Sequence, residues 1–234
     1  MSLDPLFRPV RLGAVEAGNR MLMAPMTRGR AEADGTPNDL MAAYYVQRAT
    51  AGLMITEATP VSRQGVGWLG APGMYTDAHV AGWRKVTTAA HAAKGRIVLQ
   101  LWHMGRVSHP DFHGGALPVG PSAVAAKGES HTPLGKKAYV TPRALDLAEI
   151  PGIVAAFGEA TRRARDAGFD GVEIHGANGY LVDQFLRDGS NHRTDAYGGD
   201  IEHRTRFAVE VAEACANAWS PDRVGFRVSP RGTY

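Results

Sequence analysis

Five short apolar segments, separated by stretches of helical periodicity, constrain the fold of this chain more than any other feature. The segments read RMLMA, LMITE, IVLQL, GVEIH and VGFRVS and lie at residues 20–24, 53–57, 97–101, 171–175 and 224–229. Near-continuous apolar strands are typical of a sheet that is covered on both faces. Strands that alternate with helices of roughly 10 to 15 or more residues indicate βαβ units, and therefore a parallel α/β sheet.

Helical patterns fill most of the gaps between these strands. We predict helices at residues 40–51, 79–94, 150–167, 180–186 and 201–219, and a long insertion loop rich in Gly, Pro and His at about residues 104–147. This order fits an open doubly wound sheet or a (β/α)8 barrel, which takes about 250 residues. Five strands of a barrel would leave two unpaired edges, so the chain is either an open sheet or an incomplete barrel.

Composition and charge exclude several classes of protein. Cys215 is the single cysteine, which excludes an internal disulfide and fits a reducing compartment. The net charge of +3 comes from scattered Lys and Arg residues, so no nucleic-acid partner is expected. The first residues lack the pattern of a secretory signal, and no apolar run reaches the roughly 18 residues of a membrane span. We expect a cytoplasmic protein with no membrane partner.

Two motifs match known signatures without the structural context that those signatures need. Residues 65–70 (GVGWLG) fit the dinucleotide pattern G-x-G-x-x-G, but no strand leads directly into them and no helix follows. His109 and His113 have the spacing of zinc ligands, but the proline between them opposes a helix and no convincing third ligand is present. Loops are expected in both places, and no metal site is predicted.

Polar residues stand where the predicted strands end, which is the ligand-binding edge of parallel α/β folds. Gln100 and Arg227 belong to buried strands, where an unpaired polar group is costly. Two explanations are open: these side chains pair with one another and with backbone carbonyls, or they contact a polar planar ligand. Because five strand ends carry such residues, the ligand is the more economical explanation.

Four motifs, in this order along the chain, resemble the signature of the old yellow enzyme family. They are APMTR at residues 24–28, QLWH at 100–103, HxxNxYL at 175–181 and RTDxYGG at 193–199. Within the family, the sequence is similar to the N-ethylmaleimide reductase and pentaerythritol tetranitrate reductase branch, and the resemblance runs from about Phe7 to Tyr234. It implies a single domain that binds flavin mononucleotide (FMN), a TIM (β/α)8 barrel of which residues 1–234 form the N-terminal part with about the first five strands.

The resemblance also implies the roles of the site residues. Cofactor contacts would come from Ala24, Pro25, Met26, Thr27, Ala58, Gln100, His175, Asn178 and Arg227. Substrate contacts would come from Trp68, Trp102, His175, Asn178 and Tyr180. Thr27 would bond a carbonyl of the flavin ring, and the cation of Arg227 would lie near N1 and the C2 carbonyl, where negative charge gathers in reduced flavin.

The implied activity is that of an FMN-dependent ene-reductase of the NADPH dehydrogenase type. NADPH or NADH reduces the flavin and leaves, and an activated alkene (an enone, enal, maleimide or nitroalkene) takes the same site. Hydride passes from flavin N5 to the β-carbon, His175 and Asn178 stabilise the developing enolate oxygen, and Tyr180 gives a proton to the α-carbon. On a regular helix Asn178 and Tyr180 would point about 200° apart, so their convergence requires an irregular loop.

Two departures from the family pattern stand out. Trp68 occupies a position where much of the branch has tyrosine in a substrate-facing loop, which bears on alkene preference. Complete family members are longer, and their strands six to eight supply the groups that hold the flavin phosphate. A complementary C-terminal segment or a second chain is therefore the expected partner. Two alternatives remain: a related flavin barrel such as a dienoyl-thioester reductase, and a non-catalytic ligand-binding barrel or fragment that complements a partner chain.

Overall fold

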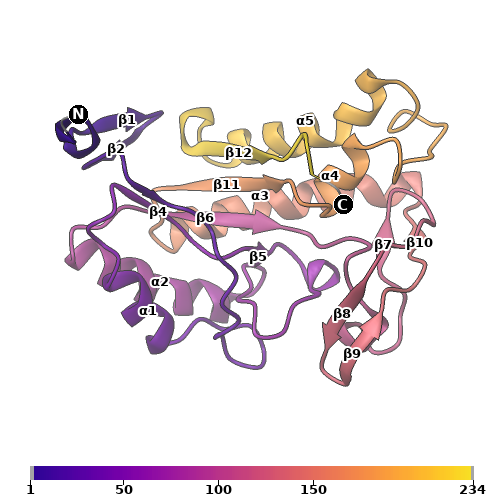
Figure 1. Ribbon diagram of the computed structural model, residues 1–234, viewed down its shortest axis with the longest axis horizontal. Helices are drawn as coiled ribbons and strands as arrows, with labels where there is room; N and C mark the ends of the chain where they lie inside the picture. The colour runs from indigo at the N-terminus through magenta and orange to yellow at the C-terminus, as the bar shows by residue number, and fades with distance from the viewer. Residues whose placement is uncertain (1–2, 233–234) are drawn as a thin grey trace.

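The computed structural model describes residues 3–232, and a parallel sheet lies at its centre (Figure 1). The main strands follow one another in chain order across the sheet, and one short strand, β5, pairs with β6 beside this path. The strands are β3 (Leu22–Met23), β4 (Leu53–Ile55), β5 (Thr59–Pro60), β6 (Ile97–Trp102), β11 (Gly171–Gly176) and β12 (Val224–Val228). In a barrel wall each strand lies beside the next one along the chain. In a doubly wound sheet the strand order reverses at one point, and no such reversal is present among these strands.

All five apolar segments form the strands that the sequence predicts, and the expected helices are present as well. They are α1 (Asp39–Val46), α2 (Asp77–Ala92), α3 (Ile150–Asp166), α4 (Leu181–Leu186) and α5 (Ile201–Ala218). Helix α1 is the one clear difference, because it ends at Val46 and not near residue 51. Three helices begin at the side chain of a capping residue, Asn38, Thr76 or Asp200, which accepts a backbone N–H of the first turn.

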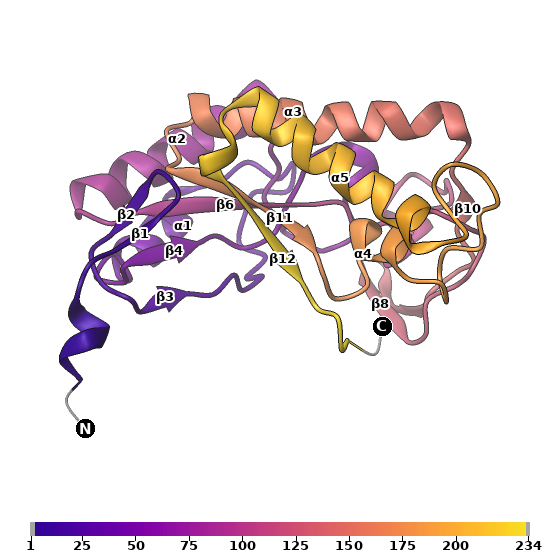
Figure 2. The same ribbon diagram turned by 90° about the horizontal axis from the view of Figure 1, so that it is seen from above.

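The helices and the sheet enclose one large apolar core. Figure 2 shows α2, α3 and α5 along one side of the sheet, and Trp83, Phe157 and Phe207 are fully buried beneath them. Cys215 is buried in the same core, and this burial raises the pKa of its thiol to about 11. The thiol is therefore as unreactive as its place in an apolar helical pattern suggests.

A hairpin covers the amino end of the sheet's other face. Strands β1 (Val10–Leu12) and β2 (Val15–Ala17) pair antiparallel, and Val15 and Ala17 form a small cluster with Leu53 and Val98. Gly13 turns the hairpin with φ of +58°, and a Cβ atom there would lie 2.1 Å from the carbonyl oxygen of Asp222. The sequence did not predict this hairpin.

The segment between β6 and α3 contains short strands of its own. β8 (Glu129–Thr132) and β9 (Gly135–Ala138) form an antiparallel hairpin that projects from the body of the protein (Figure 1). β7 (Val119–Gly120) and β10 (Arg143–Ala144) pair in parallel. Single turns of 3-10 helix lie at Asp4–Phe7, Arg63–Gly65, Pro110–Phe112, Leu147–Glu149 and Pro221–Arg223.

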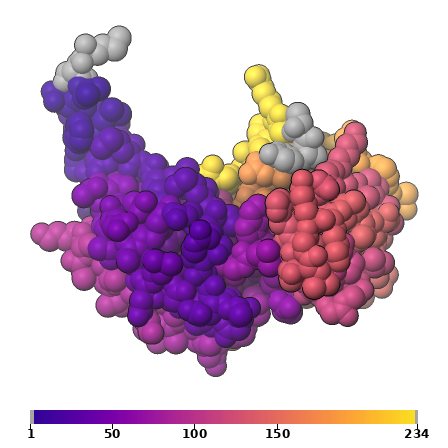
Figure 3. All heavy atoms as spheres, turned by 60° about the horizontal axis from the view of Figure 1, so that its bottom comes forward, coloured from indigo at the N-terminus to yellow at the C-terminus, as the bar shows by residue number. Residues whose placement is uncertain are grey.

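The sheet is open at both ends. β3 and β12 are its outermost strands, and apolar side chains are exposed beside them, including Leu22 (45% exposed) and Val228 (59% exposed). Figure 3 shows the N-terminal part and the last strand standing apart. The protein is thus a curled part of a barrel wall, as predicted. Within residues 3–232, no helix combines the length and apolar character needed to cross a bilayer.

Candidate active site

Three aromatic side chains meet at the carboxyl end of the sheet. Trp102 ends β6, His175 lies near the end of β11, and Tyr180 directly precedes α4. The Trp102 and His175 rings are stacked with their centroids 6.2 Å apart, and the Tyr180 ring meets both edge-on, at 4.7 Å and 4.8 Å. The structure therefore brings together three residues that the sequence analysis assigned to the substrate site.

The turn between His175 and Tyr180 is irregular, as the predicted convergence of Asn178 and Tyr180 required. Asn178 and Gly179 both have left-handed backbone conformations, with φ of +57° and +79°. The N–H of Tyr180 donates to the carbonyl oxygen of Ala177 at 3.3 Å, which closes the turn. Asparagine and glycine tolerate positive φ better than other residues, so the Asn-Gly pair suits this backbone. The Asn178 side chain is exposed.

Two buried side chains of α4 anchor this turn, and the sequence analysis did not identify either. Asp183 accepts the N–H of Gly179 at 2.8 Å and the Nε of Arg187 at 2.9 Å. Gln184 donates from Nε2 to the carbonyl oxygens of Gly179 and Met104, at 2.7 Å and 3.0 Å. No signal in the sequence marks these two residues as buried, because polar residues in a short helix are ordinarily exposed.

His175 is held in its neutral form. The side chain is only 5% exposed, and burial, assisted by the positive charge of Arg227, lowers its pKa to about 4. One ring nitrogen of a neutral histidine carries a hydrogen and the other a lone pair. Nδ1 is buried without a hydrogen-bond partner among the described residues, and the same holds for Nε1 of Trp102. Buried polar atoms of this kind are normally paired, so they point to a ligand.

A polar row crosses the inner face of three neighbouring strands. Register places Gln100 beside Glu173 and His175 beside Arg227. Gln100 donates to Glu173 at 2.7 Å, and Arg227 Nε donates to the same carboxylate at 3.0 Å. The two predicted cofactor residues are thus paired through an acid that the sequence analysis overlooked. Glu173 fixes the position of both side chains.

The residues that follow β3 lie at the open edge. Ala24 and Met26 are exposed, whereas Pro25 and Thr27 are half-buried. Ala58 is buried instead, in a small cluster with Trp102, Ala71 and Met104.

One buried carboxylate, Glu57, holds the end of the segment that follows β3. Its Oε2 accepts the N–H groups of Arg28 and Gly29, both at 2.9 Å. Its own N–H donates to the hydroxyl oxygen of Tyr45 at 2.9 Å. Burial raises the pKa of the Glu57 carboxyl group. The backbone just after Thr27 is therefore fixed by this one side chain.

A cavity of about 720 Å³ opens beside the aromatic cluster. Its lining includes Trp68, Asn178 and Tyr180, together with Lys127 and Tyr139, which flank the β8–β9 hairpin. Trp68 is 42% exposed and lies in the loop before α2. The structure thus places the predicted substrate residue Trp68 at the same cavity as Asn178 and Tyr180.

The two rejected motifs lie in loops. Residues 65–70 begin at the last residue of a single 3-10 turn (Arg63–Gly65) and are not followed directly by a helix. Nε2 of His113 lies 2.9 Å from the hydroxyl of Ser108, and Nδ1 of His109 accepts the N–H of Asp111. Across residues 3–232 no group of three or more His, Cys, Asp or Glu side chains is arranged to hold a metal ion.

A parallel barrel wall with aromatic and polar groups at the carboxyl ends of its strands is part of a β/α barrel, a fold whose functional sites lie at that end. Residues 5–234 match the NADH:flavin oxidoreductase / NADH oxidase family, and the chain belongs to this family. The family match and the relatives below confirm the resemblance to old yellow enzymes. FMN is the cofactor of the family, with NAD(P)H as reductant.

Two curated relatives illustrate the similarity. The chain is 48% identical over 235 residues to flavin oxidoreductase hxnT of Emericella nidulans, covering 97% of this chain and 60% of the relative. It is 44% identical over 231 residues to 12-oxophytodienoate reductase 7 of Oryza sativa subsp. japonica, covering 97% of this chain and 58% of the relative. The chain therefore spans about 60% of the length of such relatives.

Solved structures show the same likeness. An old yellow enzyme homologue from Zymomonas mobilis superposes with a TM-score of 0.95 at 51% identity, covering 97% of this chain and 64% of that one. Morphinone reductase in complex with tetrahydroNAD superposes with a TM-score of 0.93 at 49% identity, covering 97% and 64%.

The residues present fit the ring end of FMN. Two buried ring nitrogens, Trp102 Nε1 and His175 Nδ1, have no partner within residues 3–232, and both lie at the carboxyl edge of the sheet. The polar row centred on Glu173 lies on the inner face, where it offers amide and guanidinium donors to a flat heterocycle. Exposed Met26 supplies an apolar surface at the β3 edge.

Proposed function

We propose that this chain is the N-terminal part of an ene-reductase that reduces the C=C bond of activated alkenes such as enones, enals, maleimides and nitroalkenes. The cluster of Trp102, His175 and Tyr180 is the observation that carries the proposal. In this cluster the ring of a neutral histidine contacts the ring of Tyr180, and Tyr180 lines the cavity. Such a pair can hydrogen-bond a carbonyl or nitro oxygen and deliver a proton nearby.

The cofactor would be held along the sheet's carboxyl edge. Gln100 and Arg227 would face the polar edge of the flavin ring, while residues 24–27 and Ala58 would border it from the β3 side. Bound FMN supplies the two-electron reduction of the alkene, after NADPH or NADH has reduced it. The Arg227 guanidinium, oriented by Glu173, would stabilise negative charge that develops nearby.

His175 and Asn178 would orient the substrate, and Tyr180 would act as the acid. Because its pKa is lowered to about 4, His175 is neutral near pH 7 and donates a hydrogen bond rather than a full charge. The Asn178 amide, exposed on the same turn, would donate to the same substrate oxygen. The Tyr180 hydroxyl would then protonate the α-carbon as the enolate collapses. Trp102 and Trp68 would limit the room for the alkene.

Completion of the barrel is part of this proposal. The unpaired edges of β3 and β12, and a length of about 60% of the relatives, support a further segment or a second chain that supplies the remaining strands and the phosphate site of FMN. We also propose a cytoplasmic location, in keeping with the single cysteine.

The test uses a completed protein, in which this chain is joined to the remaining part of the Zymomonas mobilis homologue. We expect a yellow protein whose absorbance is bleached by NADPH without oxygen and restored by cyclohexenone. A protein that stays folded but remains colourless with added FMN would overturn the proposal. A yellow protein that NADPH bleaches and no activated alkene restores would leave a flavin barrel with another acceptor.

A further inference from the structure

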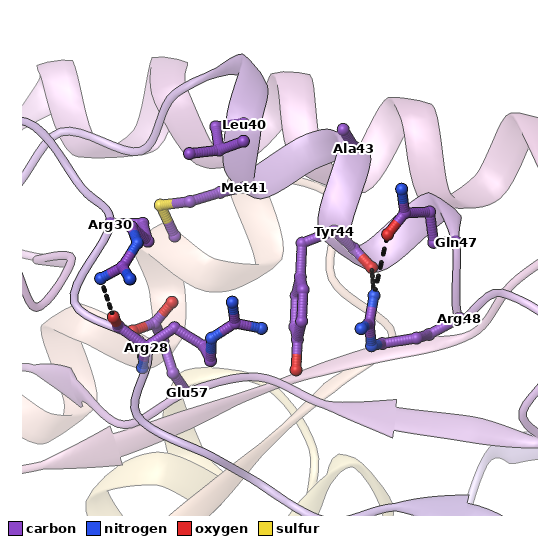
Figure 4. Close-up of a pocket in the computed structure, with 9 residues that line it drawn as sticks. All are labelled: Arg28, Arg30, Leu40, Met41, Ala43, Tyr44, Gln47, Arg48 and Glu57. Carbon is purple, nitrogen blue, oxygen red and sulfur yellow. Dashed lines mark hydrogen bonds between the residues drawn. The ribbon is translucent and has the colours of Figure 1, made fainter.

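A second pocket lies between helix α1 and the segments that follow β3 and β4 (Figure 4). Its volume is about 310 Å³, and its lining includes the arginines Arg28, Arg30 and Arg48 together with Tyr44 and Glu57. None of the three arginines belongs to the aromatic cluster or to the polar row. The proposed reaction gives this pocket no role.

Two of the arginines enclose the same tyrosine ring. The guanidinium carbon of Arg28 lies 4.3 Å from the centroid of the Tyr44 ring, and that of Arg48 lies 3.7 Å from it. Figure 4 shows the two guanidinium groups on opposite sides of the ring. Stacking on a ring fixes the plane of each guanidinium group and leaves its N–H edge available.

Three arginines and one acid line this pocket, and the acid, Glu57, interacts electrostatically with Arg28 and Arg30. Within residues 3–232, none of the three arginines has a carboxylate oxygen within 4.0 Å of its nitrogens. Arg30 donates to the carbonyl oxygens of Arg28 and Gly29, and Arg48 donates to the carbonyl oxygen of Tyr44 and to the side-chain oxygen of Gln47. Glu57, the one acid in the lining, is 2% exposed and accepts two backbone N–H groups. The pocket is therefore ready for an additional anion.

The wall of the pocket carries apolar surface next to these charges. Leu40 is 62% exposed on the outer side of α1, whereas Met41 and Tyr45 on its inner side are buried in the core. A small free anion would neutralise the arginines and leave this apolar surface in water. An occupant that covers both must carry a carboxylate on an apolar segment.

We infer that this pocket receives an aspartate or glutamate side chain from the part of the barrel that closes against β3 and α1. The inference rests on the proposed completion of the barrel. A carboxylate matches the planar N–H edges of Arg28 and Arg48, and charge-assisted pairs of this kind set orientation as well as affinity. The pocket is thus the docking point that fixes how the closing segment meets α1.

The test uses the chain and the completing segment of the Zymomonas mobilis homologue as two polypeptides, and measures the dissociation constant of their complex. Arg28→Glu should weaken association about 30-fold or more, because it places a like charge opposite the carboxylate. Arg96→Glu is the matched control, because Arg96 is exposed beyond the amino end of β6 and has no ion pair within residues 3–232. The control should change association less than about 2-fold.

A photoreactive residue in place of Leu40, whose exposed apolar side chain lines the same pocket, identifies the occupant without altering any arginine. We expect it to capture a peptide that contains an aspartate or glutamate. Changing that acid to lysine should restore association in the Arg28→Glu variant. Equal weakening by Arg28→Glu and Arg96→Glu, or capture of a peptide without an acid, would overturn the inference. The inference would also be overturned if inorganic phosphate at millimolar concentration prevented capture of the peptide. Failure of the unsubstituted pieces to associate would instead contradict barrel completion.

Discussion

The turn after β11 and the segment after β3 lie on the same edge of the sheet, but they differ in how far buried side chains of this chain anchor them. The turn is anchored by Asp183 and Gln184, both at most 4% exposed, and it presents Tyr180 against buried rings. The segment after β3 leaves Met26 48% exposed, and Glu57 accepts two of its backbone N–H groups.

This difference separates two tasks of the proposed enzyme. The groups proposed to bind and protonate the alkene are positioned by neighbours within this chain. The wall proposed to border the cofactor at β3 depends on whatever covers that edge. Substitutions near β11 should therefore act on the chain's own chemistry and stability, and substitutions near β3 should have smaller effects until the barrel is closed.

The largest expected effect is on the proton donor. In the completed protein, Tyr180→Phe should slow alkene reduction roughly 100-fold or more, because a positioned general acid contributes at least that much. Reduction of the flavin by NADPH should change less than about 2-fold. Stopped-flow absorbance measures both half-reactions separately. Tyr139→Phe, in the same cavity, is the control and should leave both rates nearly unchanged. An equal loss in both half-reactions for Tyr180→Phe would show that its role is not proton transfer.

The next effect tests the anchor of the turn. Asp183→Asn should lower the free energy of unfolding by about 2 kcal/mol, since it weakens the bond to Gly179 and removes the negative charge that pairs with Arg187. Urea unfolding of the chain measures this change. Asp188→Asn, at an exposed position of the same segment, should cost less than about 0.5 kcal/mol. Equal costs for both would mean that the turn does not depend on Asp183.

The buried histidine predicts a pH dependence of stability. The pKa of His175 is lowered to about 4 in the folded protein, so its contribution is present above the unfolded value of about 6.5 and is lost as the pH falls toward 4. Between pH 7 and pH 5 this loss amounts to about 2 kcal/mol.

A comparison with His175→Asn isolates this contribution. The variant should lose less stability over the same pH range, as followed by urea unfolding at each pH. The pKa of His103 is lowered to about 3 by burial and acts in the same direction, but it is common to both proteins and cancels in the difference. Parallel pH profiles would show that His175 is not buried in its neutral form.

The smallest effect is expected on the β3 side. Burial raises the pKa of Glu57, so its contribution to stability is present at low pH and is lost as the pH rises through the folded value. Glu57→Gln keeps an oxygen for the N–H groups of Arg28 and Gly29 and removes this loss. Its free energy of unfolding at pH 7 should be equal to that of the unsubstituted chain or up to about 1 kcal/mol higher.

Urea unfolding at pH 5 and pH 8 measures the effect of Glu57→Gln. Glu213→Gln, on the exposed surface of α5, should leave the pH profile unchanged. A loss of more than about 2 kcal/mol in Glu57→Gln would mean that the negative charge itself is required, and the contrast between the two regions would fail.

The sequence predicted the strands and helices of the barrel wall because burial on both faces makes each strand a continuous apolar run. It did not predict the β1–β2 hairpin, whose strands are three residues long and include exposed Arg11 and Glu16. Only two of its side chains, Val15 and Ala17, are buried. So few apolar residues leave no periodic pattern, and the contacts that stabilise the hairpin come from distant strands.

The chemical groups of the site were predictable from the motif of residues 175–181, but their supports were not. Glu173 pairs with Gln100 and Arg227 across 73 and 54 residues of chain, through a strand register that only the folded sheet reveals. Asp183 and Gln184 are polar residues in a short helix, where an exposed position is the ordinary expectation. Asp183 and Gln184 are buried because they bond the turn at Gly179. That turn requires left-handed backbone conformations at Asn178 and Gly179.

Cys215 is a native reporter of local opening in the helical layer. It is the one thiol of the chain and has no exposed surface. The Cys215 thiolate can react with an electrophilic dye only after the helical layer over the sheet has opened to water. The labelling rate therefore measures how often the helical layer opens, without any engineered residue. Slower labelling of Cys215 in the completed barrel than in this chain alone would show that the added strands also stabilise the helical layer, far from the edges that they cover.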